Sequence, residues 1–175
     1  MKKLTFLLFV SVFAFSCLSD DIDELTEQDI DLEIDETFDV DIVEGTTTFK
    51  GQESFSLEDE DDITDLATVE KVTIKSMTYE VKNLANDQDA IVLNGTFKVS
   101  SAEFNTIEFP LTNVTLGDIE NQVQTIDLGS GASDIAQALL NDATISVEFD
   151  ANFSESPVNF DIELVLTGSV TIDFL

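Results

Sequence analysis

Apolar and polar residues alternate along most of this chain, a pattern typical of strands that bury one face. The clearest stretch is 143–153, where every odd position is apolar or small and every even position is polar. After the segment Ser154–Pro157 the apolar positions become even, from Val158 to Leu166. A four-residue loop that pairs Phe153 with Val158 accounts for the change of parity. The pattern therefore predicts an antiparallel hairpin with one apolar face.

The same alternation predicts a second hairpin near the N-terminus. Apolar residues occupy even positions over 30–42, with Glu36 as the exception, and odd positions over 49–57. In the register that joins these strands, Glu36 lies opposite Glu53 on an otherwise apolar face. Two close carboxylates can share a proton or hold a cation. The alternative is that the strand bends at Gly51 and both side chains reach water.

A third predicted hairpin pairs residues 71–83 with 89–100. Its register places Tyr79 opposite Leu93. A β-bulge near Lys75–Ser76 keeps the apolar residues of both strands on one face along the whole length. All three predicted hairpins thus bury one face and expose the other.

The rest of the chain completes an all-β fold. Residues 104–116 read as a strand in which Pro110 indicates an edge, and Gly168 indicates a bend in one long strand whose second half finds a different neighbour. Short helices are predicted over 59–68 and 133–141. Together these elements predict an antiparallel two-sheet β-sandwich of about seven strands with two short helices. A partly closed β-barrel is the alternative.

The first 16 residues have the parts of a secretory signal. Lys2 and Lys3 give a positive start, Leu4–Phe15 is apolar, and small residues flank its end. Twelve helical residues reach about 18 Å, too short to span a hydrocarbon core of about 30 Å. We therefore expect this segment to direct export and to be removed.

The single cysteine follows directly. Ala14-Phe15-Ser16-Cys17 resembles the lipobox of bacterial lipoproteins, in which the cysteine is lipidated and becomes the first mature residue. Ser19, Asp20 and Asp21 resemble the short signal that sends lipoproteins of Bacteroidota to the cell surface. The resemblance implies an outer-membrane, lipid-anchored protein exposed at the cell surface. The alternative is an ordinary cleaved signal with an incidental cysteine.

These features predict three regions: a lipoprotein signal peptide at 1–16, an acidic tether at 17–28 and one β-sandwich domain at 29–175. Removal of the first region leaves 5 lysines against 37 acidic residues, a formal net charge of −32, with no arginine or histidine. Nucleic acid is a poor partner for such a chain, because phosphate recognition requires basic patches. The expected partners are the membrane, through the lipid, and an unidentified protein or glycan at the cell surface.

The missing residue types also restrict catalysis. Without histidine there is no Ser-His-Asp triad and no imidazole metal ligand, and lipidation of Cys17 removes the only thiol. A carboxylate pair of the glycosidase kind is the main catalytic option that remains, and Glu36 with Glu53 would supply it. We expect a protein that is not an enzyme and needs no cofactor.

Acidic residues follow the polar face of the first predicted strand. They stand at odd positions, and only Thr37 interrupts them: Asp29, Asp31, Glu33, Asp35, Asp39 and Asp41. Residues two apart lie about 6.7 Å apart along a strand, so neighbouring carboxylates can lean together around Ca²⁺. The alternative is a solvated edge that discourages strand addition.

The sequence thus favours a surface-anchored acidic lipoprotein that acts as a binding or structural module. A Ca²⁺-dependent adhesion module is the second possibility, and a carboxylate-pair glycosidase is the third.

Overall fold

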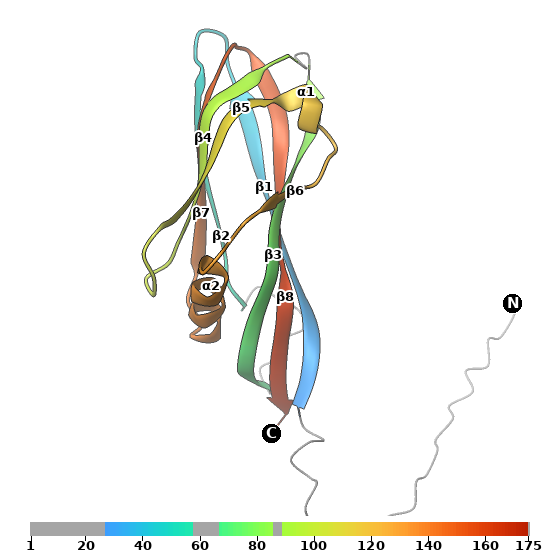
Figure 1. The fold of residues 1–175 in the computed structure, drawn as a ribbon, viewed down its shortest axis with the longest axis vertical. Helices are drawn as coiled ribbons and strands as arrows, with labels where there is room; N and C mark the ends of the chain where they lie inside the picture. Colours follow the sequence, from blue (N-terminus) through green and yellow to red (C-terminus); the bar gives the residue numbers. More distant parts are fainter. Residues whose placement is uncertain (1–26, 58–66, 86–88, 175) are drawn as a thin grey trace, which may run out of the picture.

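The fold is a two-layer β-sandwich, seen in a computed structural model that describes residues 27–57, 67–85 and 89–174. Two antiparallel sheets of four strands each pack face to face, and two short helices accompany them (Figure 1). No ladder joins the two sheets within these residues, which confirms the sandwich over the partly closed barrel. In chain order the elements are β1 (Glu27–Ile42), β2 (Thr48–Phe55), β3 (Ala67–Ala85), β4 (Ile91–Ser100), β5 (Ile107–Thr115), α1 (Leu116–Ile119), β6 (Gln124–Ile126), α2 (Gly131–Leu140), β7 (Ile145–Phe153) and β8 (Val158–Phe174).

The chain alternates between the two sheets. One sheet has the order β1-β8-β3-β6 and the other has the order β2-β7-β4-β5. Each strand is followed by a strand of the opposite sheet, except that β4 is followed by β5 in the same sheet. The β1–β2 pair of edge strands therefore lies on one side of the sandwich, and the β5–β6 pair lies on the other.

The three predicted hairpins are wrong for this reason. β1 pairs with β8, β2 pairs with β7, and β3 pairs with β8, so no two strands joined in the prediction are neighbours in a ladder. Each predicted loop instead carries the chain across the core from one sheet to the other. Parity does not distinguish the two arrangements, because strands facing each other across a core and strands paired in a hairpin both align their apolar sides.

The predicted inward faces are confirmed almost throughout. Every apolar position predicted to face inward in β7 and in the first half of β8 is at most 2% exposed. The clearest exception is Leu93, because a register shift between Val92 and Asn94 turns Val92 inward and leaves Leu93 40% exposed. The largest fully buried side chains come from both sheets and from both helices: Phe38, Phe97, Phe149, Phe153, Phe160, Ile42, Met77, Leu116, Ile135, Leu139, Ile145 and Leu166.

The C-terminal strand runs unbroken through the middle of its sheet. β8 keeps β1 on one side and β3 on the other over its whole length, so the predicted change of neighbour at Gly168 is wrong. The irregularity lies in β3, where the register shifts between Ile74 and Ser76, at the position predicted for a bulge. Gly168 lies opposite Ile74, and a Cβ there would stand 2.3 Å from the carbonyl oxygen of Thr73.

The second predicted helix and the predicted edge strand are confirmed. α2 spans Gly131–Leu140 and buries Ile135, Ala138 and Leu139, which recur at helical spacing. β5 is the outermost strand of its sheet, as Pro110 indicated. Of the helix predicted over 59–68, residues 59–66 lie outside the described part of the chain, and β3 already includes Ala67 and Thr68.

Candidate functional site

The two glutamates predicted to oppose each other lie in different sheets. Glu36 of β1 pairs with Leu164, and Glu53 of β2 pairs with Val147. Their ladder partners Leu164 and Val147 are buried, so both glutamates start on the inner face of an edge strand, where both are half-exposed. Neither lines the two cavities described below. The pair required for a glycosidase site in one hairpin is therefore not formed as predicted.

The acidic ladder of β1 points away from the core. All six of its carboxylate residues are exposed. The Thr171 hydroxyl donates a hydrogen bond to Asp29 at 2.6 Å, and the Lys75 ammonium lies 3.3 Å from the Asp31 carboxylate. Among the residues that the structure describes, no group of three or more His, Cys, Asp or Glu side chains is arranged to hold a metal ion.

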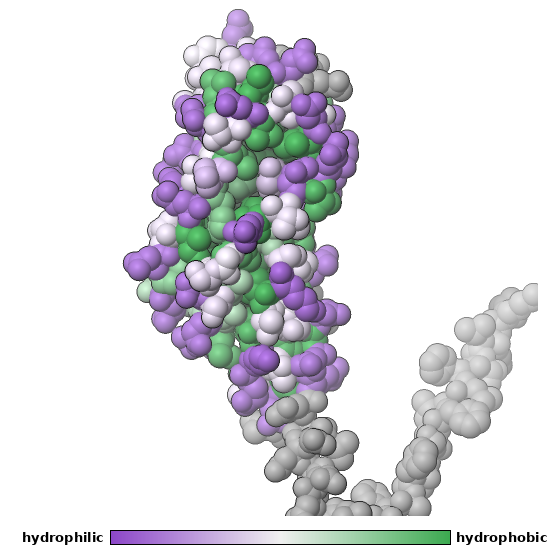
Figure 2. Space-filling view, viewed as in Figure 1, coloured by the Kyte–Doolittle hydropathy of each residue, from purple (hydrophilic) through white to green (hydrophobic). Residues whose placement is uncertain are grey.

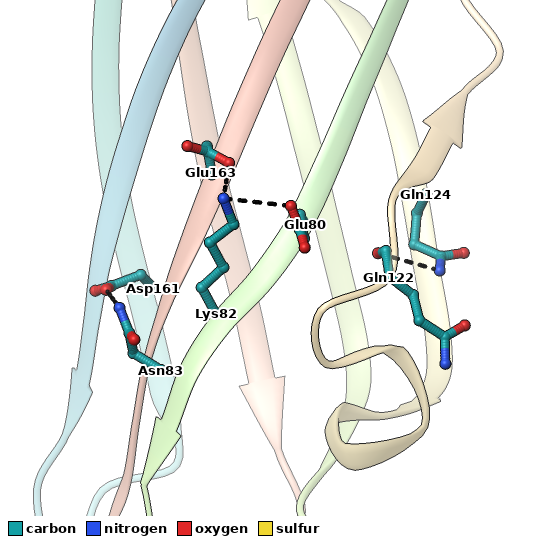
Figure 3. A network of polar contacts seen from close by, with 7 residues as sticks. All are labelled: Glu80, Lys82, Asn83, Gln122, Gln124, Asp161 and Glu163. Atoms are coloured by element: carbon teal, nitrogen blue, oxygen red, sulfur yellow. Dashed lines mark hydrogen bonds and ion pairs between the residues drawn. The ribbon is translucent and has the colours of Figure 1, made fainter.

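A lysine separates one further pair of acids on the same outer face. β3 and β8 place Glu80 directly opposite Glu163, a like-charge pair that is unfavourable by itself. Lys82 binds Glu163 and lies 3.3 Å from Glu80, between the two carboxylates (Figure 3). The hydrogen bond to Glu163 is the main reason that the pKa of Lys82 is raised above its usual value. One step along, the Asn83 amide donates to Asp161 at 2.6 Å.

Glu148 joins two lysines on the outer face of the second sheet. Lys50 lies 2.8 Å and Lys98 lies 2.7 Å from its two carboxylate oxygens. These hydrogen bonds hold the pKa of Glu148 below its usual value. A lowered carboxyl pKa means that the stability from these ion pairs is present above the usual pKa and is lost as the pH falls through the lowered pKa. These ion pairs neutralise neighbouring carboxylates on the outer faces of the two sheets.

The larger of two neighbouring concave sites lies between β5 and β6. There the edges of the two sheets enclose a cleft of about 440 Å³, within the range of ligand sites. Tyr79 and Phe97, whose ring centroids are 5.3 Å apart, close its inner end. Phe109, Pro110 and Leu111 form one wall and residues 124–127 form the other.

The cleft combines an apolar interior with an acidic rim. The charged side chains among its lining residues are Glu108 and Asp127, one from each wall, and both are exposed. Burial raises the pKa of the Tyr79 phenol above its usual value, so this group is neutral at physiological pH. A second cavity of about 360 Å³ lies beside the first, shares residues 125–127 with it and extends to Lys75 and the start of α2.

The two edges of the sandwich differ in the side chains that they present to an additional strand. On the β1–β2 edge, Glu36 and Glu53 face inward and the ladder of β1 carries acids outward. Inward-pointing charges on edge strands discourage the addition of another strand. On the β5–β6 edge the inner side is apolar, and Figure 2, which views this edge, shows hydrophobic surface along the middle of the face between hydrophilic side chains.

Sequence reasoning missed the cleft because it missed β6. This strand has three residues, pairs only with Met77–Tyr79 of β3, and is too short to show an alternating pattern. The sequence signals for the other wall were present: Pro110 marked an edge, and Phe109 and Leu111 alternate with polar residues around it. The residues of the lipobox-like segment and the export-like signal, Cys17, Ser19, Asp20 and Asp21, lie outside the described residues.

Comparison with known proteins does not assign the chain to a family. No protein-family model matches the chain, and no curated protein matches it. A chain of a solved structure described as Desmodium yellow mottle tymovirus is similar over 84% of this chain and 89% of its own, with 6% identity and a TM-score of 0.34. A likeness at this TM-score decides nothing about fold or function. No described helix is long and apolar enough to cross a bilayer.

Proposed function

We propose that this protein is a lipoprotein of Bacteroidota type, anchored in the outer membrane through Cys17 and exposed at the cell surface. Its acidic β-sandwich would act as a binding module. The observation that carries the binding role is the β5–β6 cleft: an apolar interior at one edge of a sandwich whose opposite edge carries inward-facing glutamates. The signal-like sequence at 1–21 supports the anchoring role.

The direction of the strands fits display away from a membrane. β1 begins at Glu27, opposite Asp173 at the far end of β8, and ends at Ile42. Its 16 residues correspond to about 50 Å of strand. The turn after β1 therefore lies at the end of the sandwich remote from Glu27. There Gly45 and Thr46 are held by hydrogen bonds to Ser156 and Val43.

Replacement of the anchoring cysteine tests the proposal in the cells that make the protein. We expect the wild-type protein to partition with the outer membrane and to be cleaved by protease added to intact cells. Cys17→Ser should release it from the membrane fraction, because serine lacks the sulfur to which the lipid is attached. The double variant Asp20→Asn/Asp21→Asn keeps Cys17 and should remain membrane-bound but become protected from the protease.

Two results would contradict the proposal. One is a Cys17→Ser protein that stays in the membrane fraction to the same extent as wild type. The other is a wild-type protein that is cleaved only after the cells are opened. Ser16→Ala serves as the matched control, since it alters the same segment and keeps both small size and the cysteine.

A further inference from the structure

The ligand of the cleft follows from its shape and charge. We infer that the β5–β6 cleft binds a short extended peptide segment in which apolar side chains alternate with lysine or arginine. This inference rests on the proposed binding function and names the class of partner for it. Three properties of the cleft support it: its strand-edge walls, its apolar interior and its acidic surroundings.

The walls of the cleft are backbone edges. β5 is the outermost strand of one sheet and β6 is the outermost strand of the other, so within the described residues each has one side without a strand partner. Such an edge offers backbone N–H and C=O groups to an extended peptide. Pro110 removes one N–H from β5, and β6 has only three residues. The edges therefore suit a short segment better than a complete additional strand.

The interior selects every second side chain of such a segment. Successive side chains of an extended peptide point to opposite sides, so alternate ones would enter the space lined by Phe109, Leu111 and Ile126. The buried rings of Tyr79 and Phe97 limit its depth. The remaining side chains of the peptide would point outward toward the rim.

The rim requires the outward side chains to be basic. Glu108 and Asp127 stand on opposite walls, and no lysine lines this cleft. The mature chain carries a net charge of −32, and a field of that sign attracts cationic partners and repels anionic ones. A peptide whose inward side chains are apolar and whose outward side chains are acidic would fit the interior, but its acids would be repelled by Glu108 and Asp127.

Three labelled six-residue peptides test the inference against the full-length protein in phosphatidylcholine nanodiscs, with empty nanodiscs as the blank. The first alternates Lys with Val and Phe, the second replaces each Lys by Glu, and the third keeps Lys and replaces the apolar residues by Ser. Fluorescence anisotropy should show saturable binding of the first peptide. Binding of the other two should be at least about ten-fold weaker, a difference of about 1.4 kcal/mol.

Neutralising the rim provides the site-specific arm. Glu108→Gln/Asp127→Asn should weaken binding of the first peptide about five-fold, the effect of two partly screened ion pairs. The Asp127→Asn change keeps a side-chain oxygen that can accept the hydrogen bond from the Gly129 N–H, which lies 3.1 Å from Asp127. Asp39→Asn/Asp41→Asn removes the same charge from exposed positions of β1 and should leave binding unchanged.

Three outcomes would overturn the inference. These are no binding of the first peptide, equal binding of both lysine peptides, and equal weakening by the two double variants. The last two would mean attraction by net charge alone. The anchoring experiment with Cys17→Ser does not depend on these peptides, so failure of the inference and failure of the proposed function are separate results.

Discussion

Replacing Phe149 by alanine is expected to lower the free energy of unfolding by about 3–5 kcal/mol, the usual loss for a buried phenylalanine. Phe149 is 1% exposed and lies at the centre of the aromatic core. Its ring centroid stands 4.7 Å from that of Phe97, 6.0 Å from that of Phe49 and 6.2 Å from that of Phe38. These contacts join both sheets. The cavity that Phe149→Ala leaves therefore has rigid walls on each side and closes only in part.

Urea unfolding followed by circular dichroism measures this loss. Val123→Ala is the control, because Val123 is 65% exposed and a surface truncation of this kind changes stability by no more than about 0.5 kcal/mol. A loss for Phe149→Ala below about 1 kcal/mol would contradict the packing of the two sheets on this ring.

Gly168→Ala is expected to cost about 3 kcal/mol, although it adds a single methyl group. The new Cβ would lie 2.3 Å from the Thr73 carbonyl oxygen and 3.4 Å from the Ile74 Cα. Both are backbone atoms of the bulged region of β3, so the strand itself must move. Overpacking of this kind costs about 1–3 kcal/mol, and occasionally more when no side chain can yield.

Gly131→Ala is the matched comparison for the same measurement. A Cβ at Gly131 would lie 2.7 Å from the Cδ1 of Ile107, the far end of a flexible side chain that can change rotamer. We expect its free energy of unfolding to lie within about 1 kcal/mol of the wild-type value. Alanine favours a helix more than glycine does, and this offsets part of the cost of the close contact. Equal free energies of unfolding for the two variants would contradict the close approach of β8 to β3 at Gly168.

The sequence predicted which side of each strand is buried, and could not predict which strands are neighbours. The alternation over 145–153 and 158–166 depends only on each strand having one face in the core. The choice between a hairpin and a crossing to the other sheet depends on the path of the loop. The rings of Phe153 and Phe160 illustrate this: their centroids lie 5.8 Å apart, but they belong to different sheets.

The candidate site was predicted only in part for a related reason. The sequence directed attention to carboxylates, and Glu36 was expected to oppose Glu53 because both broke an apolar pattern. The pattern placed both on the inner face of their strands, which the structure bears out. Their pairing depended on the hairpin, and the edge positions of the two strands were not predicted. The cleft depends on β6 and on the separation of two sheet edges, neither of which leaves a periodic signal in the chain.

Position-specific photo-crosslinking in intact cells tests the central claim, binding at the β5–β6 cleft, most directly. A photoreactive benzoylphenylalanine replaces Phe109 in one variant and Gln52, an exposed residue on the outer face of β2, in the other. We expect irradiation to give a discrete crosslinked product at position 109, identified by mass spectrometry, and none at position 52. No product at position 109, or the same product at both positions, would contradict a binding module that works through this cleft.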